Sequence, residues 1–178
     1  MFHDEDTNDI NCTDVMEHQT LLGNTAPVRR PQYRTQYGPR HELEVQVVNM
    51  LDKGIIRASN SLWSATGFLV PKKTADGEQK YRFCVDFRGP NAATKFDSYP
   101  LPVFEETTST IFGSRYFSVL DCYSGFWQVP IKEEHKERTG FTAQQGHYEF
   151  NRINILSMRP TETYKISKNC TGHRWILS

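Results

Sequence analysis

The four cysteines of this 178-residue chain are not paired in the sequence. Cys12, Cys84, Cys122 and Cys170 stand singly and far apart, whereas structural zinc sites and thiol redox motifs need cysteines roughly two to four residues from one another. The spacing therefore excludes both kinds of site. Scattered single thiols are typical of a protein that stays in a reducing compartment.

Long apolar runs are also missing. No run approaches the roughly 20 residues that a membrane-spanning helix needs, and the acidic amino terminus lacks the basic and then apolar pattern of a signal peptide. We therefore expect a soluble intracellular protein, or one bound to a soluble assembly, for which cytoplasmic particles and the nucleus are equally suitable. In that setting the sequons at residues 11–13 and 169–171 carry no glycan.

Basic side chains are absent from the first 20 residues, which hold six of the 21 acidic ones. The formal net charge of zero therefore hides a partition, because the rest of the chain has 15 acids against 21 bases, a net charge of +6. A modestly basic body is compatible with a polyanionic partner. It is also common on surfaces that bind nothing, and composition alone slightly favours this second reading.

The length predicts one domain with a core of its own. Three parts are expected along it. Residues 1–38 are polar, first acidic and then rich in Pro, Arg and Tyr, which predicts a leader that is flexible or follows the surface. Residues 39–150 carry the regular elements, and residues 151–178 form a tail of a different character.

Hydrophobic spacing predicts the first element. Apolar residues recur at helical intervals from Leu43 to Leu51, and Gly54 follows as a helix-ending residue, so we expect a helix over residues 40–53. Two apolar runs at 67–70 and 81–87 flank an Asp-Gly turn and predict a β-hairpin with a basic tip.

Further along, a short helix is expected near residues 104–112, followed by a strand that ends at Asp121. A second hairpin is expected at 140–143 and 148–150, turning at 144–146.

The basic tip of the first hairpin suggests a binding site. Lys72, Lys73 and Arg82 could converge on one anion, with Arg supplying a planar fork and Lys a point charge, and a triphosphate is the natural guest. Cationic hairpin tips also keep a protein soluble and block edge-to-edge pairing, and spacing alone favours that plainer role. Asp86 and Arg88, which alternate with apolar neighbours, could be an ordinary surface pair on a strand.

Asp121 ends a run of β-branched and aromatic residues, a position typical of a metal-binding carboxylate at a strand end. It could equally cap the turn that starts at Ser124. An enzyme that holds two divalent ions at a reacting phosphate needs several convergent carboxylates, and no Asp follows between Cys122 and Ser178. The sequence therefore shows one half of a phosphoryl-transfer site.

Short motifs follow one another in a definite order after the predicted helix. They are Gly54-Ile55-Ile56-Arg57-Ala58-Ser59, Ser61-Leu62-Trp63-Ser64-Ala65, Phe68-Leu69-Val70, Arg82-Phe83-Cys84-Val85-Asp86-Phe87-Arg88, Asn91, Asp97-Ser98-Tyr99-Pro100-Leu101-Pro102, Tyr116-Phe117-Ser118-Val119-Leu120-Asp121, Ser124-Gly125-Phe126-Trp127-Gln128 and Gly146-His147-Tyr148-Glu149-Phe150. This order closely resembles the amino-terminal half of a reverse transcriptase. The specific likeness is to the Pol polyprotein of long-terminal-repeat retrotransposons of the Gypsy (Ty3) type, over about three quarters of the chain.

The resemblance implies an α+β fold that is part of a right-hand polymerase, with fingers and the first palm strands in residues 39–150 and a disordered acidic leader before them. It implies RNA-directed DNA polymerase chemistry with Mg²⁺ as the cofactor. The implied partners are an RNA or DNA template-primer and a deoxynucleoside triphosphate, with no membrane.

Roles for single residues come from the same resemblance. Asp121 would be the catalytic, metal-binding Asp, and Lys72 and Arg82 would bind the triphosphate. Four residues of one turn would complete the nucleotide site: Tyr123, Ser124, Gly125 and Phe126. In that turn Phe126 would be the gate that excludes a 2′-hydroxyl, and Gly125 would allow close approach of the backbone.

The departures from the family are equally informative. After Phe150 the expected Pro-Phe-Gly-Leu and Asn-Ala-Pro turns are replaced by unrelated residues, the paired aspartates do not follow, and Pro71 replaces a basic residue. We therefore expect a truncated or degenerate fragment that does not polymerise alone, unless a partner chain completes the palm. The alternatives are a non-catalytic nucleic-acid or protein-binding remnant and a chain that does not fold stably.

Overall fold

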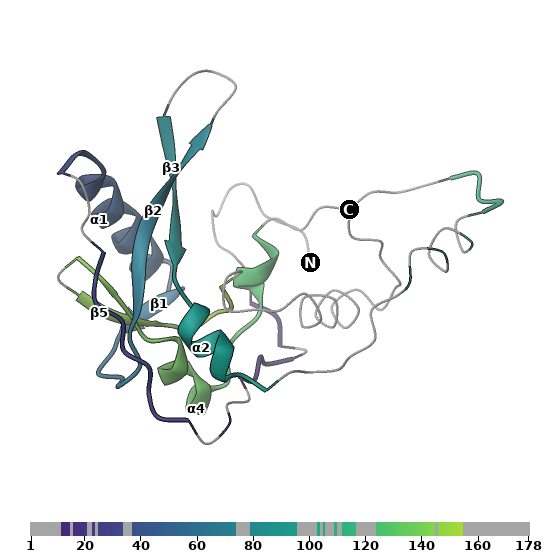
Figure 1. Cartoon of the computed structure of the whole chain (residues 1–178). Helices are drawn as coiled ribbons and strands as arrows, with labels where there is room; N and C mark the ends of the chain where they lie inside the picture. The colour runs from purple at the N-terminus through teal and green to yellow at the C-terminus, as the bar shows by residue number, and fades with distance from the viewer. Residues whose placement is uncertain are drawn as a thin grey trace.

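The computed structural model places a mixed sheet beside one long helix, which agrees with the predicted mixture of helix and strand (Figure 1). The sheet has five strands in the order β1-β5-β4-β2-β3. The structure describes residues 12–14, 16–20, 23, 25–33, 37–73, 79–95, 103, 105, 109, 112–116, 124–144 and 146–154.

Helix α1, Tyr37–Asp52, confirms the predicted helix and begins three residues earlier. Its apolar stripe of Leu43, Val47 and Met50 is buried, and the helix contacts β1, β2 and β3. Gly54 ends the turn after it with a φ of 61°, a left-handed conformation that glycine adopts without a steric penalty. The helical spacing of the apolar residues therefore predicted this element correctly.

The first predicted hairpin is confirmed as β2, Ala65–Lys73, and β3, Gln79–Val85. The strands pair antiparallel from Gly67 opposite Val85 to Lys73 opposite Gln79. Figure 1 shows the hairpin extending well beyond the rest of the sheet. The predicted Asp-Gly turn at 76–77 lies outside the described residues.

The second predicted hairpin is confirmed as β4, Phe141–Ala143, and β5, Gly146–Phe150. Strand β4 also pairs in parallel with β2, through Ala65 opposite Phe141, and β5 pairs with the edge strand β1, Ile56–Ala58. Phe141 and Phe150 are fully buried, and their ring centroids lie 4.9 Å apart. The two hairpins therefore share one aromatic core.

Short helices complete the described part. They are α2, Arg88–Ala93, η1, Gly125–Gln128, α4, Glu133–Lys136, and η2, Glu137–Thr139. The helix expected near 104–112 and the strand expected to end at Asp121 lie outside the described residues, apart from a few positions. No helix in the described part is long and apolar enough to cross a membrane.

The amino-terminal segment is bound to the body where the structure describes it. Thr13 N–H donates to the Gln128 carbonyl at 2.6 Å, His18 N–H to the Pro130 carbonyl at 2.8 Å, and Arg30 N–H to the Ser64 carbonyl at 2.8 Å. Over these residues the segment follows the surface of the body. Composition missed this because backbone groups make the contacts. Residues 1–11, which hold four of the six acidic side chains, lie outside the described part, and their disorder stays a prediction.

The packed body also continues past the predicted boundary at Phe150. Ile153 is fully buried, its N–H donates to the Val129 carbonyl at 3.0 Å, and Ile131 N–H donates to the Asn151 carbonyl at 2.9 Å. Residues 151–154 therefore pack with the body, and the rest of the expected tail, residues 155–178, lies outside the described part.

Candidate functional site

One face of the β2-β3 hairpin gathers basic side chains. Residues paired across an antiparallel ladder point to the same face, and every second residue shares it. This hairpin face is made of three paired positions: Phe68 with Cys84, Val70 with Arg82, and Lys72 with Lys80.

Lys72 and Arg82 are diagonal neighbours on the hairpin face, a relation that places such positions roughly 7–8 Å apart. Both are exposed. The structure therefore brings together the two residues that were predicted to bind a triphosphate. Lys73 ends β2, and its side chain lies outside the described part.

Lys80 is a basic residue of this face that sequence reasoning missed. It pairs directly with Lys72 and is exposed. Counting pairs outward from a two-residue Asp76-Gly77 turn places Lys80 opposite Lys73, so the turn alone did not give the observed register. Three cations, not two, therefore share the hairpin face.

The base of the hairpin holds a buried carboxylate. Asp86 is only 6% exposed, and it accepts hydrogen bonds from Arg88 Nε at 2.8 Å and from Arg88 Nη2 and Tyr33 Oη at 2.7 Å each. The hydrogen bonds from the Arg88 guanidinium hold the pKa of Asp86 far below its usual range, and the Tyr33 hydroxyl lowers it by a smaller amount. The reading of Asp86 and Arg88 as an ordinary surface pair is therefore wrong for Asp86.

This arrangement fixes a cation and an aromatic pair beside the hairpin face. The Arg88 side chain remains largely exposed while its Nε and Nη2 donate to Asp86. The Tyr33 ring packs edge-on against Phe68, with centroids 5.7 Å apart. An anionic strand with unstacked bases could use both features, because phosphates pair with Arg and bases stack on aromatic rings.

The turn at η1 contains the other predicted nucleotide-binding residues that the structure describes. Ser124 is left-handed, with a φ of 47°, and its carbonyl accepts a hydrogen bond from Trp127 N–H at 2.8 Å. Phe126 is partly buried and packs against the core. Asp121 and Tyr123 lie outside the described residues.

The two groups of predicted residues remain separate. In the described part of the chain, no hydrogen bond or ring contact joins Ser124, Gly125 or Phe126 to the hairpin residues Lys72 and Arg82. A nucleotide would have to bridge them.

The part of the chain that the structure describes contains no metal site. Among the described residues, no three His, Cys, Asp or Glu side chains gather closely enough to hold a metal ion. Asp121, the predicted ligand, has no second Asp after it in the sequence.

Comparisons with known proteins place these features in context. The family model described as "Reverse transcriptase (RNA-dependent DNA polymerase)" matches residues 70–170. The Pol polyprotein of transposon 297 from Drosophila melanogaster is 35% identical over 145 residues, which is 81% of this chain and 14% of that polyprotein. The enzymatic polyprotein of cauliflower mosaic virus, strain NY8153, is 40% identical over 118 residues, which is 65% of this chain and 17% of that one. The chain thus spans about one sixth or less of these relatives.

Solved structures show the same fold. The crystal structure of the prototype foamy virus protease-reverse transcriptase CSH mutant superposes with a TM-score of 0.76 and 23% identity, covering 91% of this chain and 21% of that one. The foamy viral protease-reverse transcriptase in complex with an RNA/DNA hybrid gives a TM-score of 0.69 and 17% identity, covering 93% of this chain and 22% of that one.

Proposed function

The chain belongs to the reverse transcriptase (RNA-dependent DNA polymerase) family, and from this premise we propose that it forms the fingers and first palm strands of a retrotransposon polymerase of the Gypsy (Ty3) type. The Drosophila transposon relative at 35% identity supports the retrotransposon origin. The observation that carries the proposal is the hairpin face, with Lys72, Lys80 and Arg82 on one side of β2-β3.

The proposed role of the hairpin face is to bind the triphosphate of an incoming deoxynucleotide. Arg82 offers a planar fork that matches two phosphate oxygens, and Lys72 adds a point charge diagonal to it. Lys80 beside them raises the local positive potential. Pro71, which separates Val70 from Lys72, contributes no charge of its own.

The proposed role of the η1 turn is to receive the sugar. Phe126 packs against the core, so its ring is held in place against a ribose 2′-hydroxyl. Ser124 and Gly125 directly precede it, and their backbone N–H groups are proposed to meet the phosphates. Tyr123, which lies outside the described residues, is proposed for the same site. Asp121 is the proposed catalytic carboxylate, and the remaining carboxylates would come from outside these 178 residues or from a partner chain.

The proposed nucleic-acid partner is a template-primer of RNA or DNA. The exposed guanidinium of Arg88 and the Tyr33-Phe68 pair beside the hairpin support this. Binding through phosphates should weaken steeply as salt rises, whereas a protein-binding role would show little salt dependence.

Replacing Lys72 or Arg82 by Gln should weaken binding of a deoxynucleoside triphosphate by about tenfold each, because each change removes a charge-assisted contact. The measurement is a titration followed by calorimetry. Lys53→Gln is the matched control, since Lys53 is an exposed cation beyond the far end of α1. If all three variants bind equally well, the hairpin face is not the triphosphate site.

The 178-residue chain alone should not extend a primed template in the presence of magnesium above background, because a single Asp leaves the ion charge uncompensated. Primer extension followed on a gel checks this result. Extension by the chain that Asp121→Asn abolishes would contradict it.

A further inference from the structure

The two halves of the proposed nucleotide site lie on different elements, with Phe126 on η1 and Lys72 and Arg82 on the β2-β3 hairpin. The amino-terminal segment contacts the surroundings of both. Its described parts, purple to dark blue in Figure 1, lie first along residues 128–132 and then beside Ser64, which directly precedes β2. The segment therefore connects the two halves independently of the core that they share.

The backbone that follows η1 is held on one edge by this segment. Thr13 N–H donates to the Gln128 carbonyl at 2.6 Å, and His18 N–H donates to the Pro130 carbonyl at 2.8 Å. Lys132 N–H in turn donates to the His18 carbonyl at 3.0 Å. These backbone hydrogen bonds begin two residues after Phe126, so they fix the chain directly behind the proposed sugar gate.

The opposite edge of the same backbone is held by the chain that follows β5. Ile153 N–H donates to the Val129 carbonyl at 3.0 Å, and Val129 N–H donates to the Phe126 carbonyl at 3.3 Å. If the amino-terminal segment moved away, this backbone would be bonded along one edge only. Because Val129 is bonded to Phe126, the change would reach the η1 turn.

Side chains of α4 and η2 hold the segment in place at Thr20. Thr20 N–H donates to His135 Nδ1 at 3.1 Å, and Arg138 Nη1 donates to the Thr20 carbonyl. Thr20 Oγ1 lies 3.2 Å from His18 Nε2, and both imidazoles are buried. We call Thr20, His135 and Arg138 the latch. Both backbone groups of Thr20 are bonded to side chains, so a single substitution on the body can release one of them.

The far end of the segment is attached to the sheet that carries the hairpin. Ser64 N–H donates to the Val28 carbonyl at 3.0 Å, and Arg30 N–H donates to the Ser64 carbonyl at 2.8 Å. Thr66 Oγ1, within β2, donates to the Pro31 carbonyl at 2.9 Å. The segment is therefore bonded to the first residues of the hairpin strand itself.

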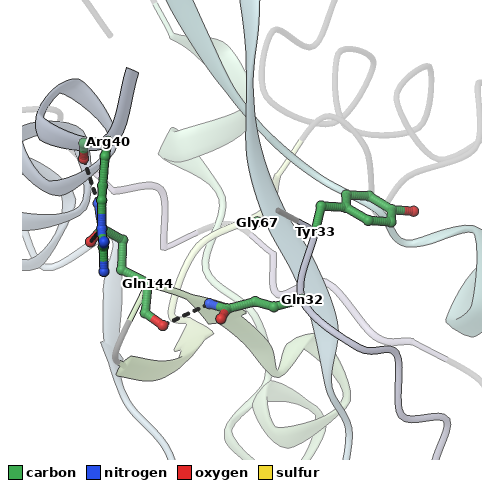
Figure 2. Close-up of a pocket in the computed structure, with 5 residues that line it drawn as sticks. All are labelled: Gln32, Tyr33, Arg40, Gly67 and Gln144. Carbon is green, nitrogen blue, oxygen red and sulfur yellow. Dashed lines mark hydrogen bonds between the residues drawn. The ribbon is translucent and has the colours of Figure 1, made fainter. Parts of the chain in front are cut away.

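A side chain of the segment adds to this attachment at the base of the hairpin (Figure 2). Gln32 Nε2 donates to the Gln144 carbonyl at 2.8 Å, and the Gln144 side chain bonds to Arg40 of α1. Together with Tyr33 and Gly67, these residues line a small pocket. The segment is thus anchored to the hairpin base at one end and to α4 and η2 at the other.

We propose that the latch positions Phe126, which makes His135 and Arg138 positioning residues for the choice between deoxyribose and ribose. The inference rests on the proposed function, because it assumes that Phe126 is the sugar gate. A gate of this kind excludes one hydroxyl group by steric contact, and a misplacement of about 1 Å is enough to impair such a fit. The triphosphate contacts on the hairpin do not depend on the latch. Loss of the latch therefore changes the preference between the two sugars more than the affinity for the triphosphate.

The test compares the binding of dATP and ATP to the 178-residue chain by titration calorimetry. His135→Phe keeps a ring but removes the acceptor for Thr20 N–H, and it should lower the preference for dATP over ATP by about threefold or more. His135→Asn offers an acceptor oxygen near the position of Nδ1 and should restore most of the preference. A general loss of stability would weaken both nucleotides together and leave their ratio unchanged.

Arg138→Gln is a second variant that acts on the other half of the latch. It removes the donor to the Thr20 carbonyl from a partly exposed position, so it should lower the ratio in the same direction while circular dichroism stays unchanged. Lys136→Gln is the matched control, because it also removes one positive charge from the same region, but Lys136 pairs with Glu133 and not with the segment. The ratio should stay the same in this control.

Phe126→Val separates the failure of this inference from the failure of the proposed function. The inference is overturned if His135→Phe and Arg138→Gln keep the ratio of Lys136→Gln while Phe126→Val lowers it, because Phe126 is then a gate that the latch does not position. If Phe126→Val also keeps the ratio, or if the unmodified chain binds dATP and ATP equally well, the proposed gate fails and the inference fails with it.

Discussion

Replacing Gly140 by Ala should lower the free energy of unfolding by about 3 kcal/mol or more, one of the largest effects expected for a single methyl group in this chain. A Cβ at this position would lie 2.3 Å from the Trp63 carbonyl oxygen and 3.2 Å from the Glu137 carbonyl oxygen. Both obstacles are backbone atoms, so no side-chain rotation can relieve the contact.

The consequence would reach the centre of the sheet. The Gly140 carbonyl accepts a hydrogen bond from Ala65 N–H at 2.8 Å, directly beside the parallel pairing of β2 with β4. A shift of Gly140 therefore strains the connection between the hairpin and the rest of the core. Unfolding in urea, followed by tryptophan fluorescence, measures the change.

Gly23→Ala is the matched control for this prediction. The nearest atoms to a Cβ at Gly23 lie 3.7 and 4.0 Å away, which is ordinary contact. Its unfolding free energy should change by less than about 1 kcal/mol. Equal stability of Gly140→Ala and Gly23→Ala would show that the backbone around Trp63 yields freely, contrary to the expectation.

Acidification should destabilise the fold through His18, by an amount on the order of 3 kcal/mol between pH 6.5 and 4. His18 is 6% exposed, and its Nε2 lies 3.2 Å from Thr20 Oγ1. Burial, and to a smaller degree the neighbouring His135, lower the pKa of His18 from 6.5 to about 4.

His135 is held in the same neutral state. Thr20 N–H donates to its Nδ1 at 3.1 Å, so that nitrogen carries no proton. Burial lowers the pKa of His135 first, Arg138 and Lys132 lower it further, and Glu134 opposes them. The amino-terminal segment is therefore attached to α4 through Thr20 N–H and the His135 imidazole, while the His18 imidazole contacts Thr20 within the segment.

The sign of the pH effect follows from these lowered pKa values. Above pH 6.5 both the folded and the unfolded chain carry a neutral His18, and its contribution to stability is complete. As the pH falls toward 4, the unfolded chain takes up the proton first, and this contribution is lost.

His18→Gln is the variant that isolates the effect, because Gln does not titrate and can still bond to Thr20 Oγ1. Urea unfolding at several pH values should give a shallower loss of stability between pH 6.5 and 4 for His18→Gln than for the unmodified chain. Parallel pH profiles would show that His18 plays no part in the acid sensitivity.

Short-range sequence patterns predicted helix α1 and the two hairpins, whose backbone contacts are close in the sequence. The spacing of Leu43 and Val47 was enough for α1, and the Asp-Gly turn between two apolar runs was enough for the β2-β3 hairpin, although not for its register. The hairpin alone brought Lys72 and Arg82 to neighbouring strands. Local patterns do not show how deeply a side chain is buried. Asp86 was therefore considered for a surface pair, although it is buried at the base of the hairpin.

Other features that were not predicted join residues distant in the sequence. The parallel pairing of Ala65 with Phe141, the bond from His18 to Pro130 and the assembly of Gln32, Arg40 and Gln144 each connect segments more than 70 residues apart. No periodicity or turn chemistry records such contacts. The pocket was therefore invisible to sequence reasoning, whereas the hairpin face was not.

The attachment of the amino-terminal segment also has a consequence for synthesis on the ribosome. Thr20 and its partner His135 are 115 residues apart, and translation proceeds at roughly 5–20 residues per second, so the segment waits roughly 6 to 23 s for its docking site to be made. Throughout that interval it is tethered to the ribosome without its native contacts. The six acidic side chains of the first 20 residues, with no basic partner among them, suit a nascent segment that must stay hydrated until its docking site exists.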